Sequence, residues 1–241
     1  MKKALIIIVS LTTIVSLIWG VNYSYSHPDS FEIVTWSNFI EQPDGITCGP
    51  TSALMVLKEY GKDVTLDDVK SQTKTEWIQY DGKPVGMTSP DYIPVALSHY
   101  GVPSKILKGD MNRLRYFVSK KRPVIVLLRS SKQGWHYVVV IGYTESEIIT
   151  ADPGPGKRKK IENSDFLRAW DFTHDMYGRN TQDDCKTCEG TGKWLNNFGP
   201  LDHCEMCDGT GKSLDYLVIL LRLVEVHPRT MIVPRIHIGE N

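Results

Sequence analysis

The sequence predicts an α+β fold in which helices come first and an antiparallel sheet follows. Two observations carry this prediction. Up to about residue 123 apolar residues recur at helical spacing, whereas β-branched and aromatic residues dominate the runs between residues 124 and 152. The length of 241 residues suffices for one mid-sized domain with a smaller appendage.

Helix signals are clearest over residues 50–61. Pro50 stands near the start of this segment, Gly61 lies just past its end, and the apolar residues between them share one face. Thr65, three residues before Asp68, is typical of the cap of a short helix. The other predicted helices cover residues 89–101 and 109–123, and residues 164–170 with Ser164 as the cap.

Strand signals follow from residue 124 onward. The first two runs are joined by the short turn KQG, and the third is stopped by the Pro/Gly turn after Asp152. The segment SFEIVTWSNF before the first helix is predicted to be extended. The predicted strands cover residues 124–131, 135–144, 147–152 and 215–226, and residues 227–241 are predicted to form a tail.

The net charge of the chain does not indicate a nucleic-acid partner. Lys and Arg together number 28, Asp and Glu also number 28, and the isoelectric point is about 7.0. The basic run KRKK at 157–160 lies between a turn and a predicted helix, which indicates a solvated loop face. We therefore expect no nucleic-acid partner.

The N-terminus has the pattern of an export segment. Lys2 and Lys3 precede an uninterrupted stretch of 18 residues, from Ala4 to Val21, that holds apolar residues with only Ser, Thr and Gly among them. This stretch nearly reaches the ~20 residues that span a bilayer, so residues 1–26 are either a cleaved signal peptide or a membrane anchor. Since lysines stay cytoplasmic, we expect the body of the protein outside the cytoplasm: secreted, periplasmic or tethered to the cytoplasmic membrane.

Cys48 stands at the foot of a predicted helix in QPDGITCGPTSALMVLKEYG. Unpaired backbone N–H groups and the positive end of the helix dipole favour a thiolate there. Gly49 would let the backbone approach a substrate closely, and Gln42 could donate to an oxyanion beside the amide of Cys48. A buried cysteine that serves only as a small apolar residue fits the same stretch.

Two later residues favour the catalytic interpretation. GWHYVVVIGY places His136 at the start of a strand, and ITADPGPG places Asp152 at the end of the next. If the two strands pair as a hairpin around TESE, both residues lie near the same end of the sheet. A carboxylate there would hold the imidazole in one tautomer and stabilise its charged form. A purely structural histidine is the alternative.

Taken in order, the segments around these residues resemble papain-like cysteine peptidases of the bacteriocin-processing, C39-like type, which cut double-glycine leader peptides. The resemblance covers Glu32 to Trp170 and resumes near Tyr216. It implies a papain-like fold over residues 32–226 and a hydrolase, a thiol protease, whose substrate is a peptide or protein. We expect no transporter domain, so double-glycine specificity is not implied.

The resemblance also implies a role for each motif residue. Cys48 would be the nucleophile, His136 the general base and acid, Asp152 the residue that orients His136, and Gln42 an oxyanion donor. Two other functions stay open. One is a non-catalytic module that binds peptides or proteins in the same cleft, and the other is an acyltransferase that uses the same residues with an amine acceptor.

Four cysteines form a separate pattern. CKTCEGTGK and CEMCDGTGK are nearly identical, with fifteen residues between the two pairs, a spacing typical of a tetrahedral zinc site. Residues 181–212 are therefore predicted to be an inserted zinc module, which resembles half of the cysteine-rich region of DnaJ-type chaperones. Disulfides are the alternative in an exported protein. The ligands of the one structural zinc ion would be Cys185, Cys188, Cys204 and Cys207.

Overall fold

The computed structural model describes residues 25–80, 83–130, 134–171, 180–184, 194–196, 199–201, 212–214 and 229–239. Its helices are α2 (Cys48–Glu59), α3 (Leu66–Thr73), α4 (Tyr92–His99), α5 (Met111–Ser119) and α6 (Asn163–Trp170). The strands up to β7 are β1 (Phe31–Glu32), β2 (Glu76–Tyr80), β3 (Lys83–Met87), β4 (Ser104–Lys108), β5 (Val124–Ser130), β6 (Gly134–Tyr143) and β7 (Glu147–Asp152). The later strands are β8 (Lys157–Glu162), β9 (Asn180–Asp184), β10 (Trp194–Asn196), β11 (Gly199–Leu201), β12 (Lys212–Leu214) and β13 (Thr230–Pro234).

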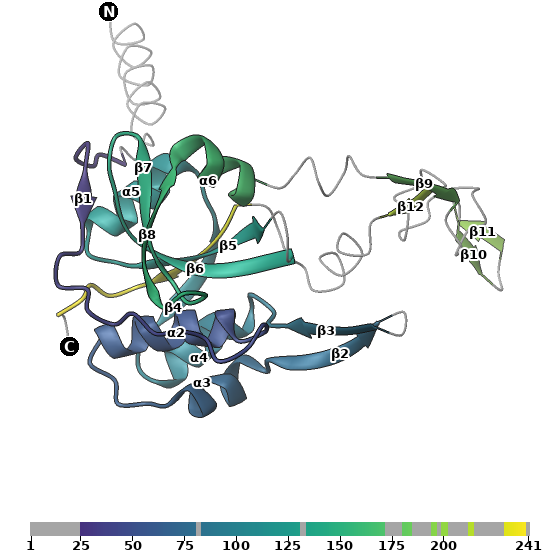
Figure 1. The fold of residues 1–241 in the computed structure, drawn as a ribbon, viewed down its shortest axis with the longest axis horizontal. Helices are drawn as coiled ribbons and strands as arrows, with labels where there is room; N and C mark the ends of the chain where they lie inside the picture. Colours follow the sequence, from purple (N-terminus) through teal and green to yellow (C-terminus); the bar gives the residue numbers. More distant parts are fainter. Residues whose placement is uncertain are drawn as a thin grey trace, which may run out of the picture.

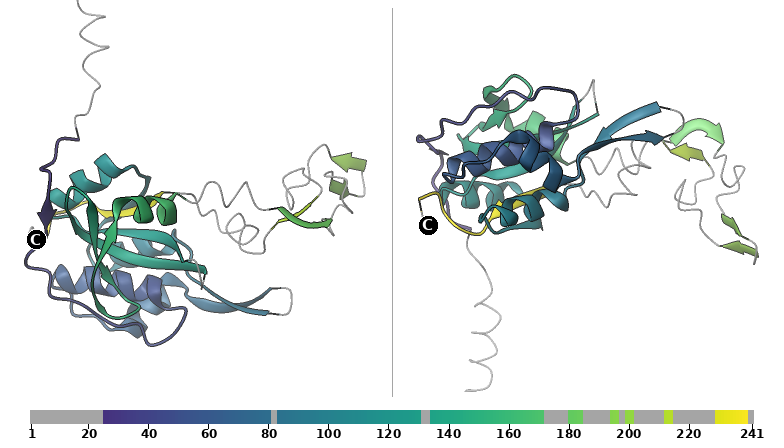
Figure 2. Two further views of the ribbon diagram at one scale, coloured as in Figure 1. Left: turned by 45° about the horizontal axis from the view of Figure 1, so that its top comes forward. Right: turned by 90° about the horizontal axis from the view of Figure 1, so that it is seen from below.

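A seven-stranded antiparallel sheet forms the centre of the fold. Its order is β4–β13–β5–β6–β7–β8, and β1 pairs with the end of β6. Helices α2, α3 and α4 lie on one side of the sheet and α5 and α6 on the other (Figures 1 and 2). The predicted α+β class, with an early group of helices and an antiparallel sheet, is confirmed.

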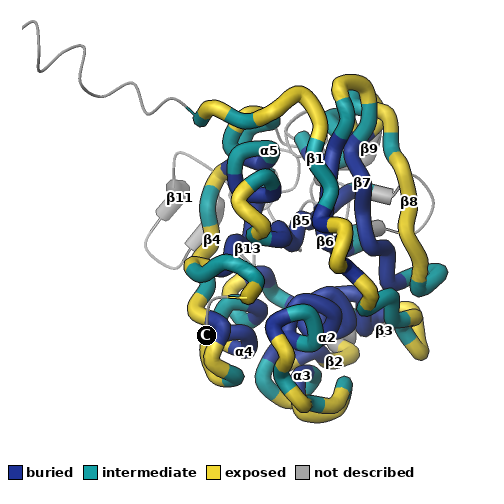
Figure 3. The backbone as a smooth tube through the Cα atoms, turned by 90° about the vertical axis from the view of Figure 1, so that its left-hand side faces the viewer, coloured by how far each residue is buried: buried dark blue, intermediate teal, exposed yellow. Residues whose placement is uncertain are grey.

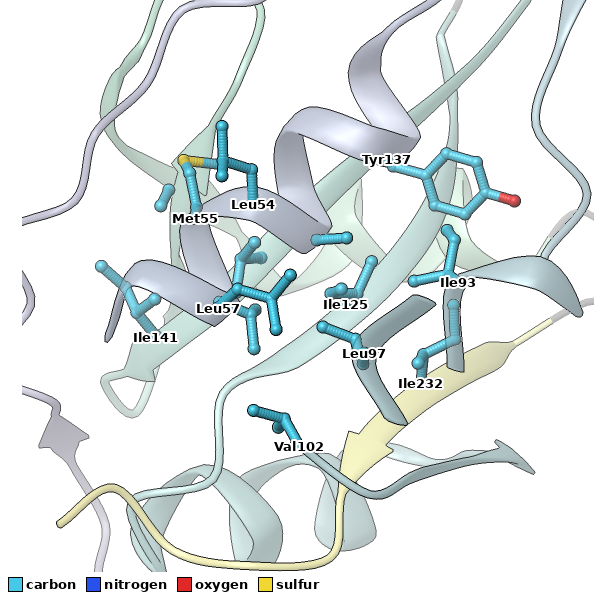
Figure 4. Packing of buried hydrophobic residues seen from close by; sticks show 14 of the residues in the cluster. Leu54, Met55, Leu57, Ile93, Leu97, Val102, Ile125, Tyr137, Ile141 and Ile232 are labelled. Carbon is cyan, nitrogen blue, oxygen red and sulfur yellow. The ribbon is translucent and has the colours of Figure 1, made fainter. Parts of the chain in front are cut away.

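The alternation of side chains along the strands divides the core in two. In β5, Ile125 and Leu127 pack in the cluster that contains α2 and α4, whereas Val126 and Leu128 pack with α5 and α6. Figure 4 shows the first cluster, with Leu57 of α2 near Ile125 of the sheet. A strand buried on both faces reads as a continuous apolar run, which is why β5 and β6 were recognisable in the sequence.

β13 corrects a predicted boundary. Residues 230–234 were expected in a C-terminal tail, but they form a strand between β4 and β5 in which all five residues are buried. The short run MIVP is a weaker signal than the longer apolar run at 215–226. That run, predicted to be the last strand, lies outside the described residues.

Several elements were not predicted. The hairpin of β2 and β3 extends from the body next to α2 (Figure 1), and β8 takes up the basic run 157–160. Figure 3 shows β8 as largely exposed beside the buried β7. The capping box of Thr65 and Asp68 is observed at α3, whereas α6 begins after Glu162 without the expected cap from Ser164.

The chain on either side of residues 172–228 is bound together. The Arg229 amide donates to the Trp170 carbonyl at 3.0 Å, and Arg229 Nε donates to Asp171 Oδ2 at 2.9 Å. The Trp170 indole also donates to the Thr230 carbonyl at 3.1 Å. These contacts hold the end of α6 next to the start of β13. We call the paired residues Asp171 and Arg229 the neck, and the segment with the four cysteines is inserted between them in the sequence.

The predicted N-terminal signal peptide or anchor cannot be followed in the structure, because residues 1–24 lie outside its described part. Among the helices that are described, none has the length and apolar character needed to cross a membrane.

The position of β13 between two other strands gives a stability prediction. Ile232 is fully buried and is paired in register with Ile106 of β4, which is 37% exposed. We expect Ile232→Ala to lower the free energy of unfolding by about 2–5 kcal/mol, since it removes buried methyl groups and leaves a cavity. Ile106→Ala is the matched control and should cost clearly less. Urea unfolding measures both, and equal effects would contradict this position of β13.

Candidate active site

Cys48 is the first residue of α2 and is buried, with 8% of the residue exposed. A turn built by Asp44 leads the chain into this helix. The Asp44 carboxylate accepts the backbone N–H groups of Ile46 and Thr47 at 3.0 and 2.9 Å. Thr47, at the cap position, makes no side-chain capping bond, so its hydroxyl does not compete for the backbone N–H groups at the start of α2.

His136 and Asp152 meet at one end of the sheet. Val139 of β6 pairs with Ala151 of β7, so His136 and Asp152 project from neighbouring strands just beyond this pair. His136 Nε2 and Asp152 Oδ1 are 2.7 Å apart, and the Gly154 amide donates to the same oxygen at 2.8 Å. The expected approach of the two side chains is therefore observed.

Cys48 is the second group that acts on this imidazole, because its hydrogen bonding and its negative charge both raise the pKa of His136. Since Nε2 faces Asp152, the ring has Nδ1 left for the thiol. The side chain of His136 is 26% exposed and that of Asp152 is 7% exposed. The three residues thus form a mostly buried chain of contacts from a helix N-terminus to a carboxylate.

Electrostatics favour the charged forms of this pair. Burial would lower the pKa of His136, but the hydrogen bonds and negative charges of Asp152 and Cys48 raise this pKa to about 9. Burial would raise the pKa of Asp152, but hydrogen bonds from His136 and Lys159 outweigh it and lower this pKa to about 2.

The effect of these shifts on stability has a definite sign. The His136 pKa lies above its usual 6.5, so its contribution is complete below pH 6.5 and is lost as the pH rises through about 9. The Asp152 pKa lies below its usual 3.8, so its contribution is complete above pH 3.8 and is lost as the pH falls through about 2. The pair therefore stabilises the fold fully between pH 3.8 and 6.5.

Gln42 lies in a loop that is bound to the turn after Asp152. Its backbone amide donates to the Pro153 carbonyl at 2.8 Å, and its side-chain amide donates to the Asp44 carbonyl at 2.5 Å. Gly156, with φ of +59°, lets the turn approach the backbone of Glu41 closely. Asp44 thus links Gln42 to the first turn of α2. The sequence reasoning missed Asp44, although an aspartate three residues before a helix cap is a recognisable turn signal.

The end of β3 packs behind the cysteine. A Cβ on Gly49 would lie 2.9 Å from Thr88, and a Cβ on Gly86 would lie 1.6 Å from the side chain of Ile46. The Tyr137 hydroxyl donates to the Thr88 carbonyl at 3.0 Å. The close contact with Thr88 therefore accounts for a glycine at position 49. The expected close approach of a substrate to Gly49 stays a prediction.

All four predicted zinc ligands lie outside the described residues. The strands around them are described in part. β9 ends at Asp184, directly before Cys185, and pairs with β12, while β10 pairs with β11 between the two cysteine pairs. In the ranges that the structure describes, no group of three or more potential metal-ligating His, Cys, Asp or Glu residues occurs.

Comparison with known proteins gives one matching family model, the Peptidase_C39 like family, over residues 32–177. The pediocin PA-1 transport/processing ATP-binding protein PedD of Pediococcus acidilactici is 31% identical over 134 residues, which are 55% of this chain and 17% of that protein. The lactococcin-G-processing and transport ATP-binding protein LagD of Lactococcus lactis subsp. lactis is 30% identical over 132 residues, 54% of this chain and 17% of that protein. The chain thus spans less than a fifth of the length of either relative.

Among solved structures, a C39-like peptidase from Bacillus anthracis superposes with a TM-score of 0.51 and 18% identity, covering 59% of this chain and 92% of that one. This likeness concerns the fold. The resemblance to C39-like peptidases is confirmed, and the prediction of a cysteine peptidase, a hydrolase, is confirmed at the level of the family. The likeness of the inserted cysteines to DnaJ-type chaperones stays a prediction.

The predicted location is corrected by the same relatives. They are transport/processing ATP-binding proteins, and in such transporters the peptidase domain lies on the cytoplasmic side, where ATP is available. The prediction of a domain outside the cytoplasm, which rested on Lys2 and Lys3, is therefore wrong by this comparison. A membrane contact through residues 1–26 stays a prediction.

The contacts of His136 predict its titration. In NMR spectra of the histidine-labelled protein, its ring should titrate with a midpoint near pH 9. Cys48→Ser should lower this midpoint, because the imidazolium loses a hydrogen-bonding and negatively charged partner. His99→Gln, at an exposed position of α4, controls for assignment and should leave the midpoint unchanged. A midpoint near the usual 6.5 in every variant would contradict the ion pair.

Proposed function

Because the chain belongs to the Peptidase_C39 like family, we propose that it cleaves peptide bonds with Cys48 as nucleophile, His136 as general base and acid, and Asp152 as the residue that orients His136. The observation that carries this proposal is the 2.7 Å contact of His136 with Asp152 beside a cysteine at a helix N-terminus. A nucleophile, a base and a third group that holds the base are the components of thiol catalysis.

The mechanism follows from these positions. The Cys48 thiolate attacks the carbonyl carbon of a peptide bond, and the electron pair of the C=O bond moves to its oxygen. When the C–N bond breaks, His136 gives its proton to the leaving amine, and a thioester remains on Cys48. Neutral His136 then takes a proton from water, the hydroxide attacks the thioester, and the carboxylic acid and the thiolate are released.

Asp152 does not need to gain a proton in these steps. Its low pKa of about 2 keeps it ionised while His136 gains and loses a proton. A fixed carboxylate therefore holds one tautomer of the neutral ring and stabilises the charged ring.

We assign Gln42 to the oxyanion. Its loop is bound to the turn after Asp152 and, through Asp44, to the first turn of α2, so the Gln42 amide and the Cys48 amide belong to one connected unit. One N–H of the Gln42 side chain donates to Asp44, and the same nitrogen has a second N–H for a substrate oxygen. Preorganised donors of this kind stabilise the charge that develops on the carbonyl oxygen.

Cleavage is tested by incubating the protein with a peptide library in H₂¹⁸O and identifying products by mass spectrometry. Cys48→Ala should abolish cleavage, and Gln42→Ala should lower kcat by about 10²–10³-fold because one oxyanion donor is lost. Gln72→Ala on α3 is the matched control and should keep activity. One ¹⁸O atom in each new carboxylate indicates hydrolysis.

Other results would favour the two alternatives. A new amide bond formed with an added amine would indicate an acyltransferase. Peptide binding that survives Cys48→Ala, with no product from the wild type, would indicate a binding module.

We also propose that the segment inserted at the Asp171–Arg229 neck holds one structural zinc ion through Cys185, Cys188, Cys204 and Cys207. The spacing of the cysteines supports this, as does the pairing of β9 with β12, because these strands flank the two cysteine pairs in the sequence. Four thiolates would fill a tetrahedral site, so the ion would have a structural role.

Metal analysis of the purified protein should find one zinc ion per chain. Removing zinc with a chelator should expose four thiols to alkylation, since deprotonated cysteines are the ligands. Cys204→Ser should reduce the bound zinc, whereas Cys48→Ser should leave it unchanged. Thiols that are released only by a reductant, without bound zinc, would show disulfides in place of the metal site.

A further inference from the structure

The basic run at 157–160 forms part of β8 and is not a uniform solvated face. Arg158 donates to Glu32 at 2.7 and 2.9 Å through two nitrogens, and Lys160 donates to Glu147 at 2.6 Å. Alternate residues of a strand point to opposite faces of its sheet. The other two residues of the run therefore point away from these two pairs.

Lys159 points toward the candidate active site. Its Nζ lies 2.7 Å from Asp152 Oδ2. The register pairs Lys159 with Thr150 and Lys157 with Asp152, so both lysines share the sheet face of Asp152. The side chain of Asp152 is 7% exposed and that of Lys159 is 46% exposed, so the ammonium covers the carboxylate from the solvent side.

Both oxygens of this carboxylate have donors. Oδ1 accepts from His136 at 2.7 Å and from the Gly154 amide at 2.8 Å, while Oδ2 is held by Lys159. Rotation of the carboxylate about its C–C bond would break contacts at both oxygens. We propose that Lys159 is a positioning residue, which holds Oδ2 so that Oδ1 stays directed at His136.

This inference rests on the proposed peptidase function and adds a residue to its site. Among the described residues, the charged groups that contact Asp152 are His136 from β6 and Lys159 from β8, and Cys48 from α2 acts on the pKa of His136. Lys159 is half-exposed, so solvent screens its charge, and the fixed orientation of the carboxylate is the larger part of its effect. Lys159 also contributes to the low pKa of Asp152.

The chain offers a close control for the test. Lys159→Met and Lys157→Met remove the same charge from the same face of β8, but the contact with Asp152 is made by Lys159. Lys159→Arg keeps a cationic donor for Oδ2. Lys159→Gln is a second uncharged variant and should behave as Lys159→Met does, and circular dichroism checks that each variant is folded.

The first measurement needs no substrate. In the full chain labelled with ¹⁵N-histidine, the ring proton that His136 shares with Asp152 is followed by NMR as the pH falls. Lys159→Met should lose this signal at a higher pH than the wild type, by up to about one pH unit, because Asp152 loses a hydrogen-bond donor and a partly screened opposite charge that lower its pKa. Lys157→Met and Lys159→Arg should match the wild type.

The second measurement is kinetic. For a cleaved peptide, Lys159→Met should lower kcat by about tenfold or more with KM unchanged, since misplacement of a catalytic group slows chemistry more than binding. Lys159→Arg should restore most of kcat. Equal behaviour of the Lys157 and Lys159 variants, in either measurement, would overturn the positioning role. A wild type that cleaves nothing would refute the proposed function, while the NMR comparison would still decide the role of Lys159.

Discussion

The buried carboxylate of Asp152 is the constraint on which the site depends. Taking a charged carboxylate out of water is unfavourable unless donors replace the lost hydration. Here the donors come from β6, β8 and the turn after β7, at distances of 2.7–2.8 Å. Such distances require that three neighbouring strands keep their register, and the long antiparallel pairings of β6, β7 and β8 supply it. The packing of the sheet and the proposed chemistry therefore both require the same register of β6, β7 and β8.

Cys48 belongs to a different layer, so it has to be brought to this carboxylate by loop contacts. The Gln42 amide binds the Pro153 carbonyl, and Asp44 fixes the chain that enters α2. Behind the helix start, Thr88 packs on Gly49 and leaves no room for a side chain there. The cysteine is thus located from two sides, by the turn after Asp152 and by the end of β3. The loop that contains Gln42 and Asp44 can therefore hold Cys48 at a fixed position relative to the sheet.

The helices and strands that could be predicted share one property. The residues that indicate each of them lie within the element itself or directly beside it in the sequence. α2, α3 and the strands β5 to β7 carry their periodicity and their end signals within themselves, and His136 and Asp152 follow from the hairpin that joins two of these strands. β13 could not be predicted in this way, because its five residues become a buried strand only through neighbours more than a hundred residues earlier in the chain. The role proposed for Lys159 depends likewise on register. In the sequence, a run of four basic residues indicates a solvated segment. Only the pairing of β8 with β7 places Lys159 on the sheet face of Asp152.

The order of β13 after the inserted segment has a consequence for how the fold closes. The strand β13, which lies between β4 and β5, follows residues 172–228, so the sheet is completed only when the ends of this segment come together. The entropy cost of closing a loop grows slowly, by about 0.6 kcal/mol for each doubling of length, so a long insertion here is tolerated. The contacts of Arg229 with Trp170 and Asp171, and the pairing of β9 with β12, offset this cost at the neck and within the insertion. An inserted module can therefore interrupt the chain directly before a fully buried strand, because the contacts of Arg229 with Trp170 and Asp171 bring the chain back to where it left the domain.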